Sequence, residues 1–204
     1  MRNKVCDTYP LLAPHIDSII PKKSQLDVIK LPDARVTVYS LEGVGPLFFQ
    51  HMDDAIIPHL SVIHRFPDQF PRVRIDRGAV RFVLSGAALM VPGLTSPGGR
   101  LPQGLSTPPP AAASQSEESE EKSTGAVAGV PVGEGKSTAD DARYYDQPEL
   151  PAGTVVVVEA EGKETACSVG VLKMGTAEMK EKKKGVGIEN GHYLGDGLWK
   201  MRVD

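Results

Sequence analysis

Short runs of apolar residues, separated by prolines and glycines, occupy the first third of the chain. The runs at 26–31, 35–39 and 46–49 are rich in β-branched and aromatic residues, which is typical of strands. Two glycines between the last two runs supply a turn. We therefore expect residues 1–71 to form a small mixed domain, built as a meander of strands with a helix at each end.

A short helix is expected near the end of this domain. Pro58 suits the first turn of a helix, because the amide that proline lacks would be unpaired there in any case. The helix would run to about Phe66, with Leu60, Ile63 and Phe66 on its buried face. His64 is expected on its surface.

The most informative pattern lies between residues 72 and 98. It favours a strand that ends at Ile75, after which Asp76 can cap a helix. Gly86 can take the left-handed conformation that ends helices, and a second strand is expected to start near Ala88. The apolar face of this helix is expected to consist of Ala79, Phe82 and Val83.

A group of basic and hydroxyl side chains lies on the outer side of the same unit. Arg77 and Arg81 are four residues apart and therefore share one side of the helix, with Ser85 one turn further on. Arg72 and Arg74 extend the cluster along the preceding strand. Such a flank is compatible with an ordinary solvated surface, and equally with a track for phosphates.

Residues 99–149 differ in composition from the rest of the chain. They contain a run of prolines at 108–110, a run of alanines, and an acidic serine-rich run at 114–121. Such a segment buries too little apolar surface to offset an ordering cost of about 1–2 kcal/mol per residue. We expect a disordered insertion at a surface turn, between an ordered part at 72–98 and another at 150–204.

The last part of the chain again has strand patterns. Strands are expected at 154–160 and 166–172, followed by a short helix or basic loop around 179–184. Residues 192–201 are strand-like with glycine interruptions, which suit bulges in a barrel. Trp199 is expected in the core of that barrel, where it would anchor the last strand.

Composition and charge limit the possible functions. The chain has 204 residues and a net charge of -3, with a pI near 6.0, so any nucleic-acid binding must come from a local basic face. Cys6 and Cys167 show no disulfide or zinc spacing. No run approaches the roughly 18 apolar residues of a membrane helix. We expect a cytoplasmic protein without a membrane association.

Motifs for catalysis or cofactor binding are weak. Residues 133–138 resemble the end of a phosphate-binding loop, but Val130 stands where the first glycine of that motif is required. The five histidines have no metal-ligand spacing, and no serine lies in a nucleophile-elbow motif. We therefore expect no enzymatic activity, no cofactor and no metal.

Two long segments resemble a known family. The segment FVLSGAALMVPGLTSPG at 82–98 and the segment KGVGIENGHYLGDGLWKM at 184–201 are similar to PUA domains, and more narrowly to the malignant T-cell amplified sequence protein family. The resemblance implies an α+β fold, in which a small N-terminal domain is followed by a PUA-type β-barrel, here interrupted by the insertion. The chain starts later than family members usually do, so either the N-terminal domain lacks a first helix or edge strand, or the gene start is mispredicted.

The resemblance further implies a function in translation. Members of the family pair with density-regulated protein, bind the small ribosomal subunit, and act in reinitiation and in the release of tRNA during recycling. RNA in PUA domains lies along the loop after the first helix and along the final strand. Together with the spacing of the arginines, this predicts RNA contacts by Arg77, Arg81, Ser85, Gly86, Leu89, Met90, Pro92, Gly93, Gly187, Asn190, His192 and Tyr193.

Alternatives from other classes remain open. PUA barrels often follow catalytic domains, so the chain could be an accessory or remnant of an RNA-modifying enzyme. It could also be a scaffold that binds only proteins. Ser96 and Thr107 each precede a proline, so either could be phosphorylated, and a phosphate there would weaken RNA binding by charge repulsion.

Overall fold

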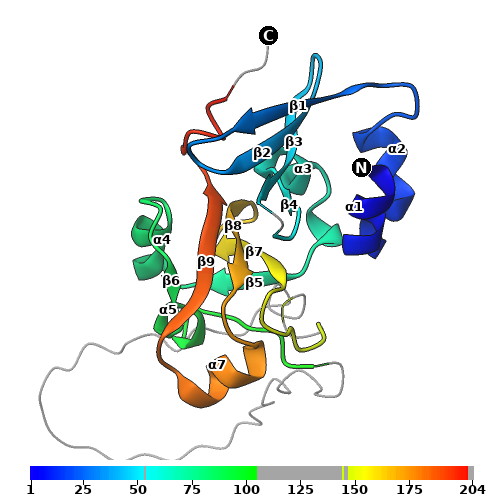
Figure 1. Cartoon of the computed structure of the whole chain (residues 1–204). Helices are drawn as coiled ribbons and strands as arrows, with labels where there is room; N and C mark the ends of the chain where they lie inside the picture. The colour runs from blue at the N-terminus through cyan, green and yellow to red at the C-terminus, as the bar shows by residue number, and fades with distance from the viewer. Residues whose placement is uncertain (53, 105–143, 145–146, 202–204) are drawn as a thin grey trace, which may run out of the picture.

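A computed structural model of the protein describes residues 1–52, 54–104, 144 and 147–201 (Figure 1). The interior of the expected insertion, the loop-like motif at 133–138 and Thr107 lie outside the described residues. The described residues form two sheets, each with its own helices (Figure 1). In this part of the chain, no helix has the length and apolar character needed to cross a membrane.

The N-terminal domain is the expected meander. Its four strands pair with their sequence neighbours in the order β1-β2-β3-β4, and every pair is antiparallel. Helical segments precede the sheet and follow it, as expected. The elements are α1 (Arg2–Thr8), η1 (Pro10–His15), α2 (Ile16–Ile19), β1 (Leu26–Leu31), β2 (Val36–Leu41), β3 (Gly45–His51), β4 (Ile57–Pro58), α3 (Leu60–Arg65) and η2 (Pro67–Gln69).

The start of α3 differs from the expectation. Pro58 pairs with Phe48 as part of β4, and the helix begins two residues later, at Leu60. The cap is His59, whose Nδ1 accepts the amide N–H of Ser61 at 3.1 Å. Proline can occupy a short edge strand because its missing amide is needed by no neighbour there. Leu60 and Ile63 are buried, as expected.

The second domain is a five-stranded sheet with short helices. Its order is β5-β7-β8-β9-β6, with β5 and β7 parallel and the other pairs antiparallel. The amide of Asp76, directly after β5, donates to the carbonyl of Gly93 in α5, directly after β6, at 3.0 Å. The elements are β5 (Arg72–Ile75), α4 (Arg77–Val83), β6 (Leu89–Met90), α5 (Pro92–Thr95), β7 (Val155–Ala160), β8 (Ala166–Leu172), α7 (Thr176–Lys182) and β9 (Val186–Tyr193).

Strand β7 lies between the two hydrophobic cores. Val156 and Val158 belong to the core of the second domain, whereas Val155 and Val157 pack with the core of the N-terminal domain. Successive side chains of a strand point to opposite faces, so a strand covered on both faces needs a continuous apolar run. The unbroken valines of β7 therefore hold the two domains together.

Both ends of the expected insertion pack on the second domain. Arg100 forms backbone hydrogen bonds with Arg74 of β5, and Leu101 is buried. After the gap, Tyr144 is buried and its hydroxyl donates to Glu159, while the side chain of Gln147 accepts the amide of Arg72 at 3.0 Å. These residues of the 99–149 stretch are therefore part of the folded domain.

The end of the chain corrects two expectations. Strand β9 ends at Tyr193, and the residues after it turn back because the Asp196 carboxylate accepts the amides of Tyr193 and Trp199. Trp199 is 39% exposed and is not in the barrel core. It stacks on His59 of the N-terminal domain, with 6.0 Å between ring centroids.

Candidate nucleic-acid interface

Helix α4 is fixed at both ends by the residues that the sequence indicated. The Asp76 carboxylate accepts the amide of Ala79 at 2.8 Å, and the hydroxyl of Ser96 donates to the same carboxylate at 2.6 Å. Gly86 has a φ of +85°, the left-handed conformation that glycine adopts with the least strain. The strand, helix, strand unit is therefore as expected.

The apolar face of α4 is not as expected. Val83 is 1% exposed, and Ala79 and Val80 pack against the core beside it. Phe82, which was expected on this face, is 52% exposed. The buried stripe of this short helix runs through Ala79, Val80 and Val83. Phe82 lies to one side of that stripe.

The basic cluster divides into two pairs. Arg77 has an 80% exposed side chain, whose Nε lies 4.0 Å from Glu161, and the guanidinium of exposed Arg81 lies 4.6 Å from the centroid of the Phe82 ring. Arg72 is only 5% exposed and Arg74 is half-buried, with its Nε donating to the carbonyl of Gly98. Of the four arginines in this cluster, Arg77 and Arg81 are therefore the two that are exposed to a ligand.

Exposed apolar side chains accompany these two arginines. Met90 of β6 pairs with Val186 of β9, and the two side chains are 48% and 38% exposed. With Phe82 and Leu84 on α4 and its C-terminus, they give this part of the domain an apolar as well as a basic surface. We call Arg77, Arg81, Phe82, Leu84, Met90 and Val186 the α4 face.

Sequence reasoning missed three members of the α4 face, namely Phe82, Leu84 and Val186. Phe82 is the instructive case, because the pattern of the helix assigned it to the core. The local sequence does not distinguish it, because an arginine directly precedes a phenylalanine at 81–82 and also at 65–66.

Other residues predicted to contact RNA have positioning or packing roles in the structure. The Asn190 side-chain amide donates to the Val83 carbonyl at 2.8 Å and accepts the hydroxyl of Ser168. The Tyr193 ring packs over Gly86, where an added Cβ would lie 3.0 Å from its hydroxyl oxygen. Ser85 is exposed, but its hydroxyl donates to the Phe82 carbonyl at 2.8 Å.

The remaining predicted residues differ in exposure. Pro92 is exposed, and Gly93 is partly buried beside Ala79. Leu89, Gly187 and His192 are buried. A buried position in a small barrel is explained by packing alone.

His192 belongs to a histidine cluster between the domains. It is fully buried, its Nδ1 lies 2.7 Å from Asp196 Oδ2, and its ring stacks on His59 with 4.5 Å between centroids. Burial, and next the proximity of His192, lower the pKa of His59 to about 4. Burial opposes ionisation of Asp196, but hydrogen bonds from His192, Trp199 and Tyr193 outweigh it and hold the pKa of that carboxyl below its usual range.

His64 also belongs to this cluster, which corrects its expected surface position. Its Nε2 lies 2.9 Å from the carbonyl oxygen of Ala166 on β8, and its ring meets Trp199 edge to face. The described part of the chain has no group of three histidine, cysteine or acidic side chains that could hold a metal ion.

Comparisons with known proteins agree with this architecture. Residues 1–67 match the Pre-PUA-like domain family. The whole chain is 42% identical to translation machinery-associated protein 20 of Schizosaccharomyces pombe, over 87% of that protein. It is 37% identical to the malignant T-cell-amplified sequence 1 homolog of Drosophila melanogaster, with 99% of this chain and 85% of that protein covered.

Solved structures share the fold at low sequence identity. A conserved PUA domain protein from Thermoplasma acidophilum has a TM-score of 0.54 at 18% identity, with 98% of this chain and 95% of that one covered. A hypothetical protein from Pyrococcus horikoshii has a TM-score of 0.57 at 19% identity, with the same coverage. The expected α+β fold, with a PUA-type barrel after a small mixed domain, is confirmed.

Proposed function

Because this chain belongs to the family of translation machinery-associated protein 20 and the malignant T-cell-amplified sequence proteins, we propose that it binds RNA of the translation machinery through its α4 face. The observation that carries this proposal is the joint exposure of Arg77, Arg81 and Phe82 on one short helix. Guanidinium groups pair with phosphates, and an exposed aromatic ring can stack on an unpaired base.

The mechanism is positioning without bond chemistry. Arg77 and Arg81 hold the phosphate backbone, while Phe82 and the apolar pair of Met90 and Val186 contact bases that are not paired. Asn190 and Tyr193 act indirectly, because they hold the C-terminal end of α4 against β9. The chain therefore acts as a binding factor and not as an enzyme.

The place of action is the small ribosomal subunit. There, together with a density-regulated-type protein partner, the chain acts in translation reinitiation and in recycling after termination, where it releases or positions tRNA. The RNA that it contacts is ribosomal RNA or the 3′ end of a tRNA. This part of the proposal rests on the family resemblance.

RNA binding by the α4 face is tested by changing its charge. Arg77→Ala with Arg81→Ala should weaken binding of a single-stranded RNA oligonucleotide and reduce the slope of log K against log salt by about 1.4, since each phosphate contact contributes about 0.7. Arg65→Ala is a matched control, because Arg65 also lies over the following phenylalanine but belongs to α3. An unchanged salt slope in the double variant would place the RNA surface elsewhere.

Ribosome association is tested by purification of the tagged full chain from cell lysate with and without RNase. We expect small-subunit proteins and a density-regulated-type partner to co-purify. Loss of the subunit proteins after Arg77→Ala and Arg81→Ala would connect the association with the α4 face. Absence of both classes from the wild-type sample would refute the ribosomal part of the proposal.

A further inference from the structure

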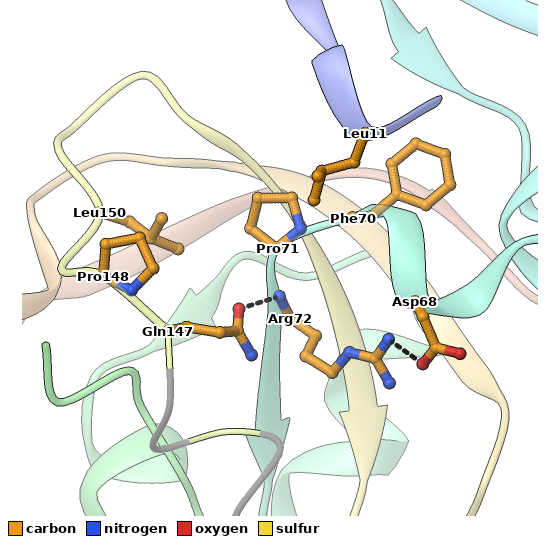
Figure 2. Close-up of a pocket in the computed structure, with 8 residues that line it drawn as sticks. All are labelled: Leu11, Asp68, Phe70, Pro71, Arg72, Gln147, Pro148 and Leu150. Carbon is orange, nitrogen blue, oxygen red and sulfur yellow. Dashed lines mark hydrogen bonds and ion pairs between the residues drawn. The ribbon is translucent and has the colours of Figure 1, made fainter. Parts of the chain in front are cut away.

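Two surface cavities of the structure differ in the charges that line them. The first, of about 340 Å³, lies at the junction of the two domains, and its charged side chains, Asp68 and Arg72, pair with each other at 2.9 Å (Figure 2). The second, of about 360 Å³, lies in the second domain and is lined by Arg100, Lys180 and Lys183. None of the described residues that line it is acidic. We call this second cavity the α7 cavity.

Lys183 carries the charge of the α7 cavity that an anion can use. Lys180 contacts Glu149 at 2.7 Å, and the Arg100 guanidinium is held by two backbone carbonyl oxygens of the cavity wall. Lys183 is exposed, and the described part of the chain places no carboxylate within ion-pair distance of it. The glutamates of α7 lie outside the lining. An anion in the cavity therefore meets the ammonium group of Lys183 without displacing a carboxylate from it.

The backbone at Lys183 has a conformation that a lysine adopts only with strain. Its φ is +50° at the position where α7 ends, and glycine is the usual residue there because it has no Cβ. A lysine at this position costs backbone strain but adds a cation to the wall of the cavity. Strain of this kind is kept most often where a side chain has a function, so it supports a use for the Lys183 charge.

The α7 cavity lies next to the α4 face. Helices α5 and α7 are at the same end of the second domain, where β9 begins (Figure 1). Val186, a member of the α4 face, follows Lys183 by three residues, so their Cα atoms are at most about 11 Å apart. Between them, the Gly185 carbonyl accepts the amide of Val91 at 2.9 Å, which fixes this segment to the residue after β6. A strand of RNA that contacts Val186 therefore needs only a short extension to reach the cavity.

We propose that the α7 cavity holds a phosphate of the same RNA strand that the α4 face binds, with Lys183 as its main contact. This inference rests on the proposed function, and it adds the direction in which the strand leaves the α4 face, past Met90 and Val186 towards α7. Proteins that bind single strands combine stacking side chains with cations that follow the backbone. Lys183 extends the row of cations that Arg77 and Arg81 begin.

Lys183→Gly is the variant that tests the cavity. It removes the charge and relieves the strained backbone, so the variant should be at least as stable as wild type in urea unfolding. With a single-stranded RNA of about twelve nucleotides, the slope of log K against log salt should fall by about 0.7, the contribution of one phosphate contact. A fourfold rise in salt should therefore weaken binding about 2.6-fold less than in wild type.

Two control variants separate the local charge from other effects. Lys183→Arg keeps the cation and should keep the wild-type slope. Arg35→Gly is the matched control, because Arg35 is also an exposed cation with a positive φ, of +52°, but lies in the turn between β1 and β2. It should leave the slope unchanged, and an equal fall in Lys183→Gly and Arg35→Gly would reduce the effect to net charge and overturn the proposal.

The length of the RNA tests the extension of the strand. An RNA of about four nucleotides, held at the α4 face, should bind Lys183→Gly as it binds wild type. The same fall in slope with both lengths would place Lys183 within the α4 face contact and overturn the extension. An unchanged slope with the longer RNA, while Arg77→Ala with Arg81→Ala lowers it, would refute the cavity and leave the proposed function standing. Weaker binding of polyglutamate, with unchanged RNA binding, would assign the cavity to an acidic protein segment and refute the proposal as well.

Discussion

The side-chain amide of Asn190 on β9 donates a hydrogen bond to the carbonyl oxygen of Val83, at the last residue of α4. The last carbonyls of a helix have no partner within the helix, so a side chain that satisfies one of them fixes the helix end. The same amide group accepts the hydroxyl of Ser168 on β8. Asn190 therefore ties the helix of the α4 face to two strands of the barrel.

The first prediction concerns this connection. Asn190→Ala should lower the free energy of unfolding by about 1–3 kcal/mol, because it removes the acceptor of the buried Ser168 hydroxyl. It also removes one of the two hydrogen bonds that the Val83 carbonyl accepts, the other of which comes from the Gly86 amide. RNA binding should also weaken, but the salt slope should not change, since no phosphate contact is lost. Urea unfolding and RNA titrations at several salt concentrations measure the two effects. A reduced salt slope would show instead that the substitution displaces Arg77 or Arg81 from a phosphate contact.

The second prediction concerns pH. The pKa of His59 in the folded protein is about 4, below the value of about 6.5 in an unfolded chain. The unfolded state therefore binds more protons between these two values, so stability is fully present above pH 6.5 and falls as the pH drops towards 4. The loss from this one group is at most about 3 kcal/mol. The groups that face His59 are His192 and Asp196 from the C-terminal segment, with His64 of its own helix and the Trp199 ring.

His59→Asn separates this effect from the titration of carboxylates. Asparagine is a good helix cap that does not titrate, so the variant can still accept the Ser61 amide. We expect its stability to fall less steeply than that of wild type between pH 6.5 and 4 in urea unfolding experiments. His15→Asn is the control. Identical pH profiles for wild type and His59→Asn would contradict the prediction.

The strand patterns were readable from the sequence because each is a local property. The Arg72 to Ile75 strand, the Asp76 cap and the left-handed Gly86 lie where their neighbours in sequence predict them. The Ala166–Leu172 strand has the limits that its β-branched run indicates.

Burial was less predictable where it depends on the other domain. The pattern of the last segment placed Trp199 in the barrel, but its ring stacks on His59, a residue 140 positions earlier in a different domain. His192 is buried for the same reason, because the N-terminal domain covers β9 at that point. No periodicity within one segment reports such a contact.

The third prediction concerns Phe82. Its ring is half exposed, so Phe82→Ala should leave stability almost unchanged while it weakens RNA binding. A stacked base contributes about 1–3 kcal/mol, which corresponds to roughly 5- to 150-fold in affinity. Leu31→Ala removes an exposed apolar side chain from β1 and should leave RNA affinity unchanged. Equal RNA affinity of wild type and Phe82→Ala would remove base stacking from the proposed interface.

The last prediction distinguishes two arginines that the sequence placed in one basic cluster. Arg72 is 5% exposed, with its guanidinium 3.4 Å from Glu159, whose side chain is 2% exposed. Arg72→Ala removes a buried guanidinium that contacts Glu159, and loss of one partner from a buried pair costs about 3–5 kcal/mol. Arg77→Ala should change stability by less than about 0.5 kcal/mol, because its side chain is largely in solvent. The free energies of unfolding of the two variants, measured in urea, should therefore differ by several kcal/mol. RNA affinity, measured at low denaturant concentration, should fall only for Arg77→Ala. A loss of less than about 1 kcal/mol in Arg72→Ala would mean that the buried pair is not needed to hold β5 against β7.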